Sequence, residues 1–374
     1  MTLLITILGF LFAIFMIVIV HEFGHFIAAK RSGVRVDEFA FGFPPNLWRK
    51  SIGETTYSVN LILLGGFVKL YGEDGSDEKD PTSYASKPPY IKILILVAGV
   101  FLNFVLGWFI LFGCYLFGMQ PIAPGMADHK GVVNNTKVII GIVEKDSPAE
   151  KNGLQKEDII KKVDGKTVSS SDDVLIYINN KTKETSGNIK VGFTIERNGQ
   201  TQEKEIETYT AKEMVGKREI ERTRIGVVVE DKGNIKATSI VTAFTASIKE
   251  FGRIVSLTVE GIVNLFKKLF LHFQVSDEAS GPVGIYKAMD FYIQRGLSQF
   301  VQLIAMLSIA IGLFNIIPIP GLDGGHVLIV LVESVFKRKF SNKTKNIIQF
   351  AGFGAIIVLF IVVSFKDLFK FGII

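Results

Sequence analysis

The sequence contains almost no cysteine and comparatively few charged residues. Cys114 is the single cysteine among 374 residues, which excludes an internal disulfide and a cysteine-based zinc site as supports of the fold. Charged residues make up only 21% of the chain, whereas apolar residues make up 48% and phenylalanine alone occurs 31 times. Intrinsic disorder is excluded, because that much apolar surface would not stay in water. Part of the chain is therefore expected to lie in lipid.

The sequence also lacks a dense basic and aromatic block of the kind that binds nucleic acid. Its 42 basic and 36 acidic residues give a net charge of +6. This modest basic excess suits an anionic membrane surface. The expected partners are therefore the lipid bilayer and proteins within it, with no nucleic acid and no nucleotide.

Four apolar runs come close to the length of about 20 residues that a transmembrane helix needs, or exceed it. The first run has no basic segment before it and no small-residue cleavage site after it, so it predicts a retained span and not a cleaved signal peptide. The four runs are Leu3–Val20, Ile91–Gly118, Phe300–Ile317 and Ile347–Ser364.

Basic residues cluster in the loop after the first run and in the loop between the third and fourth runs. Short basic loops stay on the cytoplasmic side of a membrane, so both are predicted to be cytoplasmic. The N-terminus, the segment between the second and third spans, and the C-terminus are then predicted to be extracytoplasmic. The basic residues are Lys30, Arg31, Arg35, Lys337, Arg338, Lys339, Lys343 and Lys345.

The cytoplasmic loop 27–90 contains an apolar stretch that predicts strands. Tyr57–Leu70 is rich in β-forming residues and is interrupted by Gly65 and Gly66, which favours a β-hairpin at about 54–73. Strand backbone is tolerated at membrane depth only against protein or a water-filled cavity. We therefore expect this hairpin to dip into the membrane or pack on the spans. An ordinary cytoplasmic hairpin is the alternative.

Residues 127–211 differ from the spans, because charged and turn residues increase and short β-rich runs appear. Asn198-Gly199 between two such runs predicts a tight hairpin turn, and Ser147-Pro148 predicts the start of a short helix. The order of these features resembles a PDZ domain of the bacterial, permuted type. PDZ domains bind extended peptides by adding a strand to a sheet edge. A small β-rich module without a ligand is the alternative.

The predicted fold class is a mainly α membrane protein of about four transmembrane helices, with a membrane-associated β-hairpin and one inserted extracytoplasmic PDZ domain. Residues 212–296 are expected to be a linker with one or two amphipathic helices within 237–275, which lie at the membrane face or pack on the spans. The predicted boundaries are 1–26, 91–118, 297–338 and 346–366 for the helices, 27–90 for the cytoplasmic loop and 127–211 for the PDZ domain.

The first span ends in the sequence HEFGH at residues 21–25, which fits the pattern H-E-x-x-H. On a helix His21 and His25 share one face, so both imidazoles can bind one zinc ion. Glu22 between them can take a proton from a zinc-bound water, whose pKa falls to about 7. Ionisable groups at the end of an apolar span are costly and usually functional. The alternative is a helix end whose polar groups are hydrated at the membrane interface.

A catalytic zinc usually has three protein ligands, and Asp323 is the best candidate for the third. It follows Pro318 and Pro320, which break the helix after the third span. In the predicted topology the first and third spans both run inward, which brings Asp323 to the depth of the histidines. His326 and Glu333 are rival ligands, and Asp323 could instead cap a helix.

The segments HEFGH (21–25) and NIIPIPGLDGG (315–325) together are similar to the site-2 protease family of intramembrane zinc metalloproteases, and most closely to its bacterial branch with one PDZ domain. The resemblance implies that His21, His25 and Asp323 bind Zn²⁺ and that Glu22 is the catalytic base. Further matching stretches are LGGFVKLYGE (64–73), AGVFLN (98–103) and SGPVGI (280–285). Two positions depart from the family pattern, with Val100 where proline is usual and Gly321 where alanine is common.

The same resemblance implies that Asn103 and Asn315 help to hold the substrate or the site. It also implies that the stretch 57–70, with Gly65 and Gly66, pairs with an extended substrate strand, and that the PDZ domain filters substrates by size.

The implied function is cleavage of transmembrane segments of single-span proteins, such as anti-sigma factors or signal-peptide remnants, in regulated intramembrane proteolysis. The implied location is the inner or plasma membrane of a bacterium, with the active site near the cytoplasmic side. The alternative is an inactive membrane scaffold with a structural metal site, in which His326 is a fourth ligand. A metal transporter is not favoured, because the fourth span has essentially no polar residues.

Overall fold

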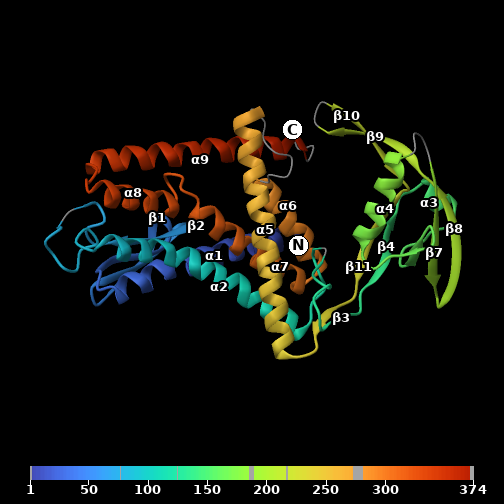
Figure 1. Ribbon diagram of the computed structural model, residues 1–374, viewed down its shortest axis with the longest axis horizontal. Helices are drawn as coiled ribbons and strands as arrows, with labels where there is room; N and C mark the ends of the chain where they lie inside the picture. Colours follow the sequence, from blue (N-terminus) through green and yellow to red (C-terminus); the bar gives the residue numbers. More distant parts are fainter. Residues whose placement is uncertain are drawn as a thin grey trace. The chain divides into compact units, whose positions relative to one another are not determined.

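A computed structural model describes residues 2–75, 77–123, 125–184, 189–215, 218–272 and 281–370 of the chain (Figure 1). The fold divides into two compact units. The first unit consists of residues 1–112 and 247–368, and the second consists mainly of residues 113–246. Ser280, the first residue of the SGPVGI stretch, lies outside the described residues. The first unit therefore contains all the residues that the sequence predicts to bind metal.

Four helices in the described part of the chain are long and apolar enough to cross a membrane, in agreement with the four predicted spans. They are α1 (Thr2–Arg31), α2 (Pro89–Phe117), α7 (Leu297–Ile316) and α9 (Asn342–Lys370). α7 is the most enclosed, since 50% of its most apolar stretch is buried, compared with 6% for α9. The apolar side chains of α9 are therefore mostly exposed, as expected for a helix that faces lipid.

The predicted segment 297–338 contains two helices instead of one. α7 ends at Ile316, and α8 (Asp323–Phe336) begins after a break at residues 317–322. Pro318 and Pro320 cannot donate backbone hydrogen bonds, which explains why the helix stops here. α8 has 14 residues and rises about 21 Å, which is too short to cross the bilayer. It places Asp323 in its first turn, directly after the break.

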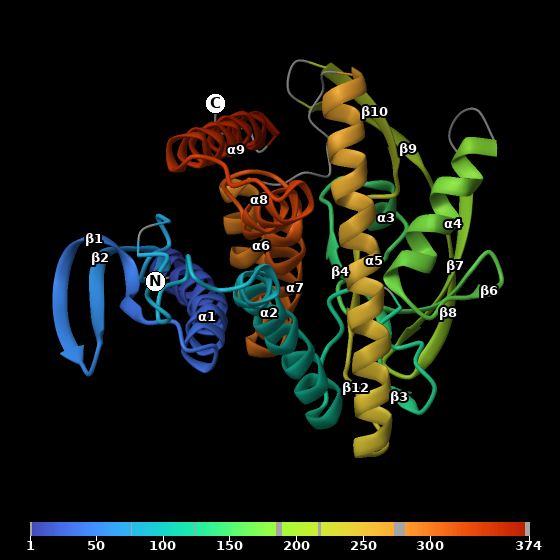
Figure 2. The same ribbon diagram turned by 60° about the vertical axis from the view of Figure 1, so that its left-hand side comes forward.

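α6 (Pro282–Arg295) packs against α1 and α7 (Figure 2). An apolar cluster joins the three helices. The buried members of this cluster are Ala13, Ile17, Met289, Leu303 and Ile304. The backbone amides of Gly281 and Gly284, at the start of α6, donate to the buried carboxylate of Asp367 at 2.8 Å each. The helix that carries the two histidines is therefore held in a well-packed core.

Strands β1 (Val36–Ile52) and β2 (Thr55–Leu70) pair antiparallel. The prediction of a hairpin within 54–73 is wrong, because residues 55–70 form one long strand. Its partner is β1, which precedes it, and the turn between the two strands contains Gly53 at φ +61°. Phe39 pairs with both Val68 and Tyr57, so the first half of β1 lies between the two halves of β2. Among the described residues no strand pairs with the far edge of the second half of β2. That half ends the sheet as an edge strand.

Gly65 and Gly66 lie within β2 and not in a turn. A Cβ at Gly66 would lie 2.9 Å from the Ala40 carbonyl oxygen and 3.2 Å from Glu22 Cγ. Glycine is therefore needed here because β2 and α1 approach each other closely. Glycine within a strand often marks such a close approach and not a turn. This packing role explains why the sequence pattern was misread as a turn.

α5 (Ile240–His272) is one continuous helix in the region predicted to hold one or two amphipathic helices. In the first unit, the indole N–H of Trp108 donates to Ser247 Oγ at 3.1 Å. The rings of Phe104 and Phe251 meet edge to face. This part of α5 therefore packs on α2, which favours the second of the two predicted arrangements.

The second unit is built around a six-stranded sheet, in which α4 packs its apolar face on the strands. The strand order is β11–β4–β5–β7–β8, with β6 paired to β5. The elements are β3 (Val132–Asn134), β4 (Lys137–Val143), α3 (Pro148–Lys151), β5 (Ile159–Val163), β6 (Lys166–Thr167), α4 (Ser171–Glu184), β7 (Lys190–Arg197), β8 (Gln200–Glu207), β9 (Tyr209–Val215), β10 (Arg218–Arg224), β11 (Val227–Lys232) and β12 (Ile235–Ala237).

The predicted turn between β7 and β8 is present, with Asn198 at φ +51° and Gly199 at φ +79°, as a two-residue hairpin loop requires. The predicted end of this region at residue 211 is wrong, because β11 pairs with β4 inside the same sheet. The highly charged β9–β10 hairpin separates β11 from the preceding strands in the sequence. This insertion explains why the short run Val227–Val229 was not recognised as part of the sheet.

Candidate metal centre

His21 and His25 project from the last third of α1 into the core of the first unit. Both side chains are nearly buried, and their Nε2 atoms lie 3.2 Å apart. The i, i+4 spacing on a helix places the two rings on one face, as the sequence predicts. The two nitrogens therefore point at a common position.

A close crossing of α1 and α2 fixes His25. A Cβ at Gly24 would lie 2.3 Å from the Ala98 carbonyl oxygen, and a Cβ at Gly99 would lie 2.5 Å from His25 Nε2. Small residues of this kind let two apolar helices approach closely. The approach allows His25 Nδ1–H to donate to the Ile95 carbonyl oxygen at 2.8 Å. This bond leaves the lone pair of Nε2 free to bind a metal.

The other ring nitrogen of His21 faces the side chain of Asn103. Asn103 Nδ2 lies 3.2 Å from His21 Nδ1, and Asn103 Oδ1 is buried without a hydrogen-bond partner in the described part of the chain. Rotating the amide by 180° places its oxygen against Nδ1 and gives that oxygen a donor. His21 Nδ1–H then donates to Asn103 Oδ1, and His21 Nε2 is free to bind a metal.

Asp323 approaches the two histidines from the first turn of α8. Its Oδ2 lies 3.0 Å from His21 Nε2 and 3.4 Å from His25 Nε2. This oxygen is buried and has no hydrogen-bond partner among the described residues. An anionic oxygen without a donor beside two imidazole lone pairs is unfavourable unless a cation lies between them. Nitrogen and oxygen ligands of a tetrahedral zinc are themselves about 3.3–3.6 Å apart, so the spacing fits a zinc ion.

Glu22 lies next to the histidines, where α1 meets the edge half of β2. Gly66 is packed against its Cγ, and the backbone amide of Val68 faces its carboxylate. Glu22 can therefore reach both a water molecule on the metal and a polypeptide that lies along the edge of β2. The position of Glu22 and its carboxylate group suit a general base.

The other predicted residues lie outside this group. Among the described residues, the metal-binding group consists of His21, His25 and Asp323. Asn315 lies half-buried in the last turn of α7, just before the break, and Gly65 packs against the ring of Phe43. The rival ligands His326 and Glu333 line a polar cavity next to the group.

Three features that support the histidines were not given a role from the sequence. The Ile95 carbonyl is a backbone group and leaves no signal. Gly99 was readable as a glycine inside an apolar span. Ser308 donates to the Asn103 carbonyl oxygen at 2.8 Å and is fully buried in α7. A hydroxyl group inside an apolar span could have indicated it.

Replacing Asn103 by leucine is expected to weaken metal binding by about tenfold or more, as the loss of an outer-shell partner of a ligating histidine usually does. Leucine has a similar size but cannot accept from His21 Nδ1–H. The measurement is competition between the protein and a chromogenic chelator for Zn²⁺ or Co²⁺. Asn180→Leu is the matched control, because it makes the same change at an exposed position of α4 in the second unit. Equal affinity of the Asn103→Leu variant and the parent would contradict the assigned contact.

Comparison with known proteins adds sequence similarity to this geometry. A family model described as Peptidase family M50 matches residues 9–359. A Rickettsia conorii protein that is provisionally named a zinc metalloprotease is 31% identical over 380 residues, which cover 96% of this chain and 97% of the relative. Zinc metalloprotease RasP of Oceanobacillus iheyensis is 28% identical over 446 residues, which cover 97% and 98%. The family match includes the positions of both histidines and of Asp323.

Proposed function

The chain belongs to peptidase family M50, the site-2 protease family of zinc metalloproteases, and from this we propose that it cleaves transmembrane segments of single-span membrane proteins. It is a membrane protein and an enzyme that uses Zn²⁺. The observation that best supports the proposed substrate is the position of His21, Glu22 and His25 on a helix apolar enough to span the bilayer. A peptide bond that reaches them would come from within or beside the membrane.

We assign the metal ligands as His21 Nε2, His25 Nε2 and one carboxylate oxygen of Asp323. The bound zinc ion would polarise the scissile carbonyl group and acidify a water molecule. Glu22 takes the proton from that water and later passes it to the leaving amine, so no net proton is consumed by the base. Burial between α1, α2 and α8 keeps the ligands oriented and limits competing water.

The edge half of β2 is the proposed binding site for the substrate. A transmembrane helix shields its carbonyl groups by hydrogen bonding, so it must unwind locally before cleavage. Strand addition to an unpaired sheet edge provides main-chain partners for the extended form. Gly66 and Val68 bring this edge to Glu22. The added strand would therefore lie across the catalytic base.

The Gly66→Ala substitution is expected to lower the rate of cleavage by about tenfold, since a misplacement of about 1 Å near a reacting group can cost up to about 100-fold. The new Cβ would lie 2.9 Å from the Ala40 oxygen and 3.2 Å from Glu22 Cγ, so β2 must shift away from α1. Zinc content should stay at the parental level. Gly354→Ala, within helix α9, is the control, because no atom lies within 4 Å of its added Cβ and its backbone is helical. An unimpaired Gly66→Ala enzyme would exclude this edge from substrate binding.

The proposed setting is a bacterial inner or plasma membrane, with a multi-pass topology and the second unit outside the cell. The catalytic residues would then lie near the cytoplasmic side, and cleavage of anti-sigma factors or signal-peptide remnants would be regulated intramembrane proteolysis. We propose the second unit as a PDZ-like module that limits access to the site. A closed four-ligand site with His326 as the fourth ligand would support the inactive-scaffold alternative, and among the described residues His326 lies outside the group of three.

The test is cleavage of a single-span reporter by the purified full-length protein in lipid vesicles that contain zinc. Mass spectrometry of the products should place the cut within the reporter's transmembrane segment or at its edge. A zinc chelator should abolish the products, and added zinc should restore them. A cut in a soluble tail of the reporter, with its transmembrane segment intact, would contradict the proposed substrate class.

A further inference from the structure

A polar cavity of about 820 Å³ lies in the first unit beside the metal centre. Its walls come from the end of β2 with the loop that follows it, from α8, and from the α8–α9 loop. His326 lines the cavity one helical turn after Asp323, and Leu70 lines it two residues after Val68 of the β2 edge. The cavity therefore continues the path of the β2 edge beyond the catalytic base.

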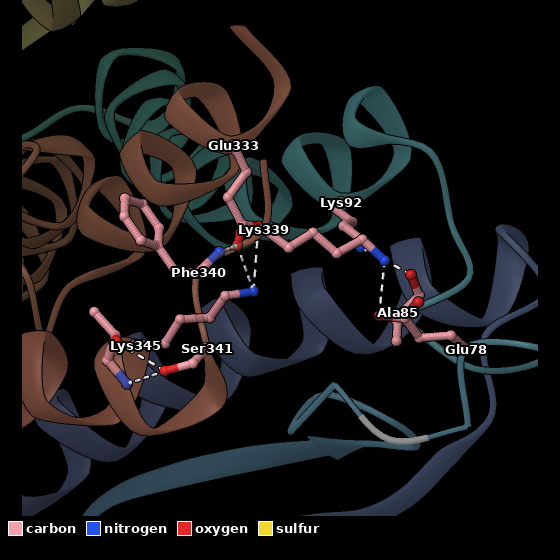
Figure 3. A network of polar contacts seen from close by, with 9 residues as sticks. Glu78, Ala85, Lys92, Glu333, Lys339, Phe340, Ser341 and Lys345 are labelled. Atoms are coloured by element: carbon pink, nitrogen blue, oxygen red, sulfur yellow. Dashed lines mark hydrogen bonds and ion pairs between the residues drawn. The ribbon is translucent and has the colours of Figure 1, made fainter. Parts of the chain in front are cut away.

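Ion pairs and hydrogen bonds join several of the charged side chains that line this cavity (Figure 3). Lys339 Nζ lies 2.7 Å from a carboxylate oxygen of Glu78, and Lys345 Nζ lies 2.8 Å from one of Glu333. Glu333 also accepts from the Phe340 backbone amide at 2.7 Å. Lys92 donates to the Ala85 carbonyl oxygen at 3.0 Å. These groups join the loop after β2, the start of α2 and the α8–α9 loop.

Glu73 also lines the cavity, where its side chain is accessible, and its carboxylate has no ion pair among the described residues. Its carboxylate accepts one described hydrogen bond, from the Leu70 backbone amide at 3.4 Å. Glu22, His25 and Asp323 all act electrostatically on Glu73, so Glu73 lies within electrostatic range of the proposed metal centre. Lys69 also lines the cavity, and its side chain is exposed, as that of Glu73 is.

The surroundings of Glu73 favour a cation. Burial raises the pKa of Glu73, and although the Leu70 amide and His25 act in the opposite direction, Glu22 and Asp323 raise it further. Burial also raises the pKa of Tyr84, as do the nearby carboxylates of Glu73, Asp323 and Glu333. Lys345 neutralises Glu333, and the proposed zinc ion neutralises Asp323. A basic group that entered the cavity would therefore be stabilised mainly by Glu73.

We propose that Glu73 binds a lysine or arginine side chain in the cytoplasmic flank of the polypeptide that is being cleaved. The inference rests on the proposed function and on the proposed orientation. Cytoplasmic flanks of transmembrane segments are rich in lysine and arginine, so the ligand is common among single-span proteins. A strand along β2 advances about 3.3 Å per residue. The basic residue should therefore lie a few residues away from the cleaved bond.

The test uses full-length enzyme in vesicles and three single-span reporters. The reporters differ only in the residues of the cytoplasmic flank, which are lysine in the first, glutamine in the second and glutamate in the third. Parental enzyme should prefer the lysine reporter. Glu73→Gln should lower kcat/KM for this reporter by about fivefold, mainly through KM, which is the upper end for loss of a solvent-accessible ion pair. The same variant should change cleavage of the glutamine reporter by less than about twofold, and Glu73→Lys should prefer the glutamate reporter.

Glu78→Gln is the matched control, because Glu78 lines the same cavity but is already paired with Lys339. It should keep the parental order of reporters. An equal loss with all three reporters in Glu73→Gln would show a structural role and overturn the inference. A parental enzyme that cleaves the three reporters equally well would overturn it too. A parental enzyme that cleaves none of them would overturn the proposed function itself.

Discussion

Glu22→Gln is expected to reduce cleavage of a single-span reporter by about 10³-fold while the zinc content stays at one ion per chain, which is within the range for loss of a general base. Glutamine keeps the size of the side chain and its packing against Gly66, but it cannot take a proton from water. The histidines and Asp323 are untouched, so the metal should remain bound. The rate and the metal content are to be measured on the same preparation.

The matched control for this substitution is Glu54→Gln, which makes the same chemical change at an exposed position in the turn between β1 and β2. It should cleave at the parental rate. A Glu22→Gln enzyme that cleaves within a few-fold of the parent would show that another group is the base. If the Glu22→Gln variant lost zinc as well as activity, Glu22 would have a role in metal binding and not a role as general base.

Asp323→Ala is expected to lower zinc affinity by more than about 100-fold, because even the loss of an outer-shell partner costs about 10–100-fold. The substitution removes the oxygen that lies 3.0 Å from His21 Nε2 and 3.4 Å from His25 Nε2. Two imidazoles alone leave the ion with half of a tetrahedral shell. Metal analysis after dialysis against a weak chelator measures the effect, and cleavage should be lost in parallel.

His326→Ala is the control for Asp323, since it removes the nearest other candidate ligand, one helical turn away on α8. This variant should retain zinc. Stoichiometric zinc in Asp323→Ala, together with loss of zinc in His326→Ala, would transfer the third ligand to the histidine.

The sequence predicted the parts of this fold whose signals are local. H-E-x-x-H needs only the helical period to bring His21 and His25 together, and the four spans need only long apolar runs. The prediction that Asp323 lies near the two histidines came from the directions of the first and third spans in the membrane. Soluble proteins offer no such constraint. Pro318 and Pro320 indicated the break between α7 and α8 directly.

The parts that the sequence did not predict depend on contacts between distant elements. Gly65 and Gly66 were interpreted as a turn, whereas the close approach of α1 makes glycine necessary at position 66. β11 belongs to the sheet because β4 needs a partner, and this pairing crosses a charged hairpin. The hydrogen bond from His25 to the Ile95 carbonyl involves a backbone group, which any residue could supply.

The two halves of the metal centre are far apart in the order of synthesis. A ribosome makes the pair of histidines on α1 almost at once, but it adds Asp323 only after about 300 further residues, a delay of about 15–60 s at bacterial elongation rates of about 5–20 residues per second. A nascent chain thus has histidines but no complete site for the ion during most of translation. The proposed zinc site therefore stays incomplete until α8 has been synthesised, and the proposed peptidase activity cannot begin before then.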